Sequence, residues 1–115
     1  MAAETVQLVC DEYGAGPPIV VLHGLFGAAR NWQSVARELA STHRVIAVDL
    51  RNHGRSPHTA AMDYDVMAAD VQRLLAERDL REVTLLGHSM GGKTAMTAAL
   101  QDASRIARLI VVDIT

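Results

Sequence analysis

The sequence predicts an α/β protein with a mostly parallel sheet and helices on both faces of that sheet. The first observation behind this prediction is an alternation: short apolar runs are followed by segments whose apolar residues recur at helical spacing. The second is size, because 115 residues, of which 50% are hydrophobic, suffice for one globular domain at most. We therefore treat residues 1–115 as a single unit, without repeats or an interdomain linker.

The first half of the chain is expected to hold three strands, one helix and a long loop. Residues 5–9 form the first expected strand, and a turn rich in glycine and proline leads into the second at 19–22. Apolar residues at helical spacing predict a helix over 31–40. A strand at 44–48 comes next, followed by the polar loop 49–59. This loop contains glycine, proline and two histidines, a composition that often borders a functional site.

The second half repeats the alternation of helix and strand. A helix is expected from Asp65 to about Asp79, and a strand follows at 83–86. The next helix covers 90–101, where several alanines allow a close approach to the sheet. Residues 109–112 form the last expected strand.

Charge and cysteine content exclude several partners and locations. The net charge is −2 with acids and bases interspersed, so the chain offers no basic stripe to a nucleic acid. Cys10 is the single cysteine and permits no internal disulfide, and the first residues lack the features of a secretory signal. No apolar run approaches the roughly 18 residues that span a bilayer. We expect a soluble cytoplasmic protein with no membrane or nucleic-acid partner.

The most informative motif is a serine between two glycines at the junction of an expected strand and an expected helix. Ser89 has Gly87 two positions before it and Gly91 two positions after it. A sharp strand-to-helix turn exposes such a serine at the edge of a sheet, and the two glycines let the strand and helix backbones approach closely. We interpret Ser89 as a nucleophile on a nucleophile elbow.

Four blocks in a fixed order support a family resemblance. They are His-Gly-Leu-Phe-Gly at 23–27, Asp-Leu-Arg-Asn-His-Gly-Arg-Ser-Pro at 49–57, Gly-His-Ser-Met-Gly-Gly-Lys at 87–93 and Val-Val-Asp-Ile at 111–114. With these blocks the chain resembles the N-terminal half of an α/β-hydrolase. Within that superfamily it is similar to the small bacterial esterases, a group that includes mitochondrial abhydrolase-11-type proteins. The resemblance implies strands 1–6 of the hydrolase sheet without the last two strands and the lid.

The resemblance implies a reaction and the residues that carry it. Ser89 would attack the carbonyl of a small ester or thioester and form an acyl-enzyme. The oxyanion would receive hydrogen bonds from the backbone N–H of Met90 and from that of Leu25 or its neighbour Phe26. Neither a metal nor another cofactor is expected.

The resemblance also implies residues beside the pocket and a missing base. His23, Gly24 and His88 would lie next to the pocket, with the two histidines bracing backbone turns. In the family the catalytic histidine follows the last strand, whereas this chain ends 26 residues beyond Ser89. We therefore expect the chain alone to be inactive or feeble. Some relatives carry the acid of the catalytic triad after the sixth strand, and the resemblance implies Asp113 as the residue for that role. A carboxylate that braces a loop is the simpler interpretation of Asp113.

Several alternatives remain open at this point. His53 and His58 lie on a loop at the edge of the sheet that also carries the serine, and either could replace the missing base. A second hypothesis is a non-catalytic fragment or pseudo-hydrolase that keeps the elbow only for folding. A bare edge strand at 109–112 also predicts self-association or pairing with a complementary C-terminal segment.

A rival motif overlaps the elbow. Residues 87–94 match the P-loop pattern Gly-x-x-x-x-Gly-Lys-Thr, in which Lys93 would hold phosphates and Thr94 a metal ion. The blocks at 23–27 and 49–57 have no role in a P-loop protein. The two readings also differ in geometry, because an elbow places Lys93 inside the helix, whereas a P-loop stays open until the Gly-Lys pair. The sequence therefore favours the hydrolase.

Overall fold

The computed structural model describes residues 4–112, which form one five-stranded sheet. The strands lie in the order β1-β3-β2-β4-β5, with β1 at Cys10–Tyr13, β2 at Pro18–Leu22, β3 at Arg44–Val48, β4 at Val83–His88 and β5 at Ile106–Val112. β1 pairs antiparallel with β3, and all the other neighbouring strands are parallel. The prediction of a mostly parallel sheet is confirmed.

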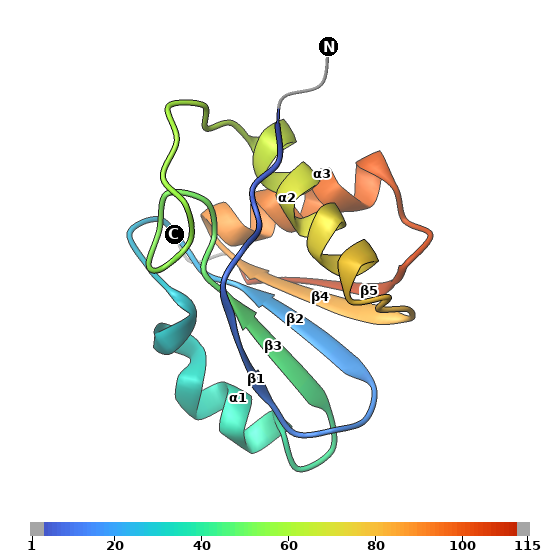
Figure 1. Ribbon diagram of the computed structural model, residues 1–115. Coiled ribbons are helices and arrows are strands. Elements are labelled where there is room, and N and C mark those ends of the chain that lie inside the picture. The colour runs from blue at the N-terminus through green and yellow to red at the C-terminus, as the bar shows by residue number, and fades with distance from the viewer. Residues whose placement is uncertain (1–3, 113–115) are drawn as a thin grey trace.

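Helices cover both faces of the sheet, as expected (Figure 1). A short 3₁₀ turn at Ala29–Trp32 leads into α1 at Gln33–Leu39, while α2 covers Tyr64–Glu77 and α3 covers Met90–Gln101. Figure 1 shows α1 on one face of the sheet and α2 with α3 on the other. Each face has its own apolar core: the larger packs α2 and α3 against the sheet, and the smaller packs α1 against it.

The strand expected at 5–9 is wrong, because the first strand is β1 at Cys10–Tyr13. Side chains accept hydrogen bonds from two backbone N–H groups of residues 5–9, and the Val9 carbonyl accepts from the Asp49 N–H at 2.9 Å. The Val6 N–H donates to Asp70 Oδ1 at 2.9 Å, and the Val9 N–H donates to Ser56 Oγ at 2.8 Å. Leu8 is buried in the larger core, which explains the apolar pattern that suggested a strand.

The last strand begins earlier than the expected 109–112. β5 starts at Ile106, and its pairing with β4 includes a register shift between Val83 and Thr84. Its first residues include Arg108, which interrupts the apolar run by which the strand was recognised. Much of β5 is exposed, with Leu109 41% and Ile110 44% accessible to solvent. Among the described residues, no helix is long and apolar enough to cross a membrane.

The arrangement of parallel strands determines where a site can form. The carboxyl ends of β2, β3 and β4 meet at one edge of the sheet, and open α/β sheets bind ligands at that edge. The loop after β2, the loop after β3 and the turn between β4 and α3 therefore come together there.

Candidate active site

Ser89 occupies a strained turn between β4 and α3. Its backbone angles are φ 54° and ψ −113°, a conformation that side-chain-bearing residues rarely adopt, and α3 begins at the next residue. The Ser89 side chain is exposed at the carboxyl edge of the sheet. This is the geometry of a nucleophile elbow, in which strain persists because the surrounding structure holds the turn.

The two flanking glycines make the turn sterically feasible. A Cβ atom on Gly87 would overlap the backbone of Gly91, and one on Gly91 would overlap the carbonyl groups of Leu22 and His23. The turn is also anchored by the Ser89 backbone, whose N–H donates to the Val112 carbonyl at 3.1 Å. The elbow therefore depends on close contacts among α3, β2, β4 and β5.

The loop after β2 forms a tight turn beside the elbow. The Gly27 N–H donates to the Gly24 carbonyl at 2.9 Å, and Phe26 has a φ of 63° at the third position of this turn. The Phe26 N–H donates to His53 Nε2 at 3.1 Å, so it is already occupied. No residue from 4 to 112 accepts a hydrogen bond from the N–H of Leu25, and the same holds for the N–H of Met90.

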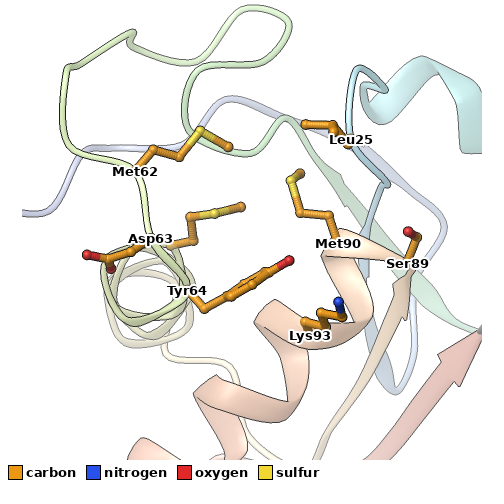
Figure 2. Close-up of a pocket in the computed structure, with 8 residues that line it drawn as sticks. Leu25, Met62, Asp63, Tyr64, Ser89, Met90 and Lys93 are labelled. Atoms are coloured by element: carbon orange, nitrogen blue, oxygen red, sulfur yellow. The ribbon is translucent and has the colours of Figure 1, made fainter.

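A cavity of about 400 Å³ opens between Ser89 and the start of α2 (Figure 2). Its walls are mostly apolar and carry a few polar groups at the rim. They comprise Leu25, Met62, Asp63, Tyr64, Met67, Ser89, Met90 and Lys93. Three methionines line this cavity: Met62, Met67 and Met90. Asp63 and Tyr64 were not singled out, because nothing in the sequence ties the start of α2 to the elbow.

Of the two histidines expected beside the pocket, His23 braces backbone, and His88 makes an aromatic contact instead. No histidine lines either cavity that Ser89 borders. His23 and His53 are buried, and both ring nitrogens of each lie within hydrogen-bonding distance of backbone groups. His88 packs near Trp32, with ring centroids 6.1 Å apart, on the face that carries α1. His58 is exposed on the loop after β3.

His23 is held as a neutral imidazole. Burial lowers its pKa from the ordinary value, because the charged ring would lose its hydration. Its Nε2 accepts the Leu50 N–H at 3.0 Å, and its Nδ1 lies 2.7 Å from the Gly24 carbonyl. A carbonyl only accepts, so Nδ1 carries the proton and neither nitrogen is left for a substrate.

The P-loop interpretation does not fit the geometry. α3 begins at Met90, so Lys93 lies within its first turn and not at the end of an open loop. Thr94 is fully buried, and its hydroxyl donates to the Met90 carbonyl at 2.9 Å, which leaves it unable to reach a metal ion. The positions of Lys93 and Thr94 therefore favour a nucleophile elbow over a P-loop.

The acidic and basic residues of the loop after β3 have structural partners. Asp49 accepts hydrogen bonds from the Ala29 N–H at 2.8 Å and from the Arg55 side chain at 2.8 Å. Burial alone would raise the pKa of Asp49, but these bonds outweigh it and lower the pKa. Arg51 pairs with Asp70 of α2 at 2.8 Å and not with Asp49. Asp49 and Arg51 thus organise the loop after β3, and the Arg51 pair ties this loop to α2. Asp113 lies outside the described residues.

Comparison with known proteins places the chain in a family. The family model described as alpha/beta hydrolase fold matches residues 17–115. The chain therefore belongs to the α/β-hydrolase family, as its motifs predicted. The described residues correspond to the N-terminal portion of that fold, since similar structures extend well beyond it.

Individual relatives are esterases and lipases by name. The chain is 47% identical over 119 residues to the sn-1-specific diacylglycerol lipase ABHD11 of Xenopus laevis, covering 99% of this chain and 38% of the relative. It is 43% identical over 97 residues to Esterase YbfF of Escherichia coli (strain K12), covering 84% of this chain and 38% of that protein. The structure of a marine microorganism esterase superposes with a TM-score of 0.91 at 42% identity. The match covers 93% of this chain and 41% of the esterase chain. The chain thus spans about 38% of the length of these curated relatives.

Proposed function

We propose that this chain carries the nucleophile and oxyanion site of a serine hydrolase that acts on carboxylic esters or thioesters. The observation that supports this most strongly is the strained Ser89 turn next to two backbone N–H groups without described acceptors, those of Leu25 and Met90. The Phe26 N–H donates to His53, so of the two neighbouring residues we propose Leu25 as the donor to the oxyanion. The Met90 N–H lies at the start of α3, where the helix dipole also favours an anion.

The mechanism follows from these groups. Ser89 Oγ attacks the ester carbonyl, and the oxygen that becomes negative accepts hydrogen bonds from Leu25 and Met90. The alcohol or thiol leaves, and water then hydrolyses the acyl-enzyme. A serine hydroxyl needs a base to take its proton, and no described histidine lines the two cavities that include Ser89. We propose that the base comes from outside residues 4–112, with Asp113 as the acid, and that residues 4–112 without it react slowly.

The cavity indicates the kind of acyl group. Its methionines give an apolar and adaptable wall, which suits an apolar acyl chain more than a polar one. A volume of about 400 Å³ is within the range of small-molecule sites. We propose a neutral ester of a short to medium acyl chain as the substrate class, handled without a metal or other cofactor by a cytoplasmic enzyme.

A non-catalytic module is the second candidate. The absence of a histidine from the cavities beside Ser89, within residues 4–112, favours it. The two candidates predict different reactivity of the same serine, which makes them separable by one experiment.

Covalent labelling with a fluorophosphonate probe tests the proposal. The wild-type chain should take up one probe per molecule, and Ser89→Ala should take up none. Ser34→Ala is the matched control, because Ser34 is exposed on α1 at a distance from the elbow in sequence, and it should label like wild type. Equal labelling of wild type and Ser89→Ala, or none in either, would favour the non-catalytic module.

The exposed β5 edge supports a proposal about partners. Leu109, Ile110 and Val111 are each about two-fifths exposed on an edge strand, and such strands pair readily with further strands. We propose that β5 pairs with a complementary C-terminal segment or with a second copy. Size-exclusion light scattering at micromolar concentration should show a dimer or larger species for the 115-residue chain if β5 pairs with a second copy, and a clean monomer would exclude that pairing. Addition of the complementary segment to the monomer should then give a one-to-one complex, and no complex would refute the proposal.

A further inference from the structure

Two histidines connect the loop after β2 with the loop after β3 in a reciprocal way. His23 belongs to the first loop and accepts the N–H of Leu50 from the second at 3.0 Å. His53 belongs to the second loop and accepts the N–H of Phe26 from the first at 3.1 Å. The ring centroids are 5.0 Å apart, so the two contacts lie side by side. Each loop thus supplies an imidazole that fixes the backbone of the other.

The protonation state of His53 follows from its partners. Its Nδ1 lies 2.9 Å from the Arg51 carbonyl, which only accepts, so Nδ1 carries the proton. Its Nε2 is then the acceptor that the Phe26 N–H requires. His53 is 7% exposed, and both of its nitrogens are engaged. The ring is therefore unable to act as a base for Ser89 while it holds Phe26.

Phe26 depends on this contact more than a buried residue would. Its φ of 63° lies in the left-handed region, which costs free energy for any residue with a side chain. Its side chain is 91% exposed, so packing contributes little to holding the conformation. The turn is held by hydrogen bonds at both ends: the Gly24 carbonyl accepts from the Gly27 N–H and from His23 Nδ1, and the Phe26 N–H donates to His53. The bond to His53 is the one that holds the Phe26 amide itself.

We propose that His53 is a positioning residue that sets the direction of the Leu25 N–H by holding the neighbouring Phe26 amide. The inference rests on the proposed function, because it assigns Leu25 a role at the oxyanion. The Leu25 N–H lies on the peptide unit before the one that carries the Phe26 N–H, and the two units are joined at the Leu25 Cα within one tight turn. Loss of the Phe26 anchor lets this turn relax, and the Leu25 N–H then moves with the Leu25 Cα. A donor displaced from the oxyanion slows the chemical step and leaves the binding of the acyl chain in its cavity unchanged.

The variants His53→Leu and His53→Gln separate positioning from general loop stability. Leucine fills similar space without an acceptor, whereas the glutamine side-chain carbonyl can accept the Phe26 N–H. We expect His53→Leu to lower the limiting rate of fluorophosphonate reaction at Ser89 by at least 10-fold with the half-saturating probe concentration unchanged. His53→Gln should recover most of that loss. The matched control His43→Leu changes a half-buried histidine directly before β3, and should change neither value.

Amide exchange provides a readout that does not need catalysis. In the full 115-residue chain, His53→Leu should speed hydrogen exchange at Phe26 and shift the Leu25 and Phe26 amide signals, and His53→Gln should restore both. Unchanged amides would overturn the proposal, and so would displaced amides with an unchanged limiting rate. If wild-type Ser89 does not react at all, the proposed function has failed. The amide exchange alone then decides whether His53 holds this turn.

A measurement on the wild-type chain covers the case in which His53→Leu does not fold. A scalar coupling across the hydrogen bond between the Phe26 amide nitrogen and His53 Nε2 is expected in a ¹⁵N-labelled sample. Its presence would support the contact directly, and a Phe26 amide that exchanges freely without such a coupling would overturn the proposal.

Discussion

Replacing Asp70 with alanine should destabilise the protein strongly, because it removes the counterion of a buried arginine. Arg51 is 2% exposed and donates to both oxygens of Asp70, at 2.8 and 3.0 Å. Donation to the Asp70 carboxylate raises the pKa of the Arg51 guanidinium, so Arg51 stays charged at any accessible pH. Asp70 also accepts the Val6 N–H at 2.9 Å.

The magnitude follows from breaking one side of a buried ion pair. Leaving a charge uncompensated in the interior costs about 3–5 kcal/mol. A chain of this length has a free energy of unfolding of roughly 6–17 kcal/mol, so the loss is a large fraction of the total. Arg51 also donates to Thr59 Oγ1 and to the Ala61 carbonyl, each at 3.0 Å. The variant should therefore also loosen the segment that carries Met62 to the cavity wall.

Urea unfolding followed by far-ultraviolet circular dichroism measures this effect. The midpoint for Asp70→Ala should fall by roughly 2 M, given the usual dependence of unfolding free energy on urea. Glu77→Ala is the matched control, because it removes the partner of Arg73 in a pair with side chains 36% and 40% exposed. Such a pair contributes about 0.5 kcal/mol or less. A loss below about 1 kcal/mol in Asp70→Ala would refute the reasoning.

Three further predictions concern the elbow, the loops and the cavity. Gly91→Ala should cost about 2 kcal/mol or more in a thermal melt, since its Cβ would overlap the carbonyls beneath α3; an unchanged melting temperature would contradict the tight elbow. The pKa of His23 is lowered by burial, so its contribution to stability is complete above pH 6.5 and is lost as the pH falls below that value. Urea unfolding at pH 7.5 and 5.5 should show a larger loss in wild type than in His23→Gln, and equal losses would exclude His23 as the cause. Met67→Ala should enlarge the cavity and shift the preference among nitrophenyl esters toward longer acyl chains; an unchanged order of rates would show that Met67 does not limit chain length.

The sequence predicted the elements with strong periodicity and missed the contacts that depend on distant partners. The helix expected over 65–79 is found at Tyr64–Glu77, and the one expected over 90–101 at Met90–Gln101, because helical spacing marks a buried face. The strand expected at 5–9 failed for a physical reason. Its backbone bonds to the side chains of Asp70 and Ser56, which no local pattern reveals.

The same distinction holds at the candidate site. The glycines around Ser89 carry a local signal, so the elbow could be located by its spacing alone. The choice between Leu25 and Phe26 could not be made in this way, because it depends on whether His53, 27 residues further along the chain, accepts the Phe26 N–H. The cavity wall at Met62 and Tyr64 could not be predicted from the sequence either, since only the folded chain brings the start of α2 close to the elbow.

The central claim is that Ser89 is the nucleophile of an acyl-transfer reaction. The most direct test is to incubate the chain with a nitrophenyl ester, quench with acid and determine by peptide mass spectrometry which residue carries the acyl group. We predict an acyl adduct on Ser89 that is absent from Ser89→Ala. An adduct on any other residue with Ser89 unmodified, or no adduct after prolonged incubation, would contradict the claim.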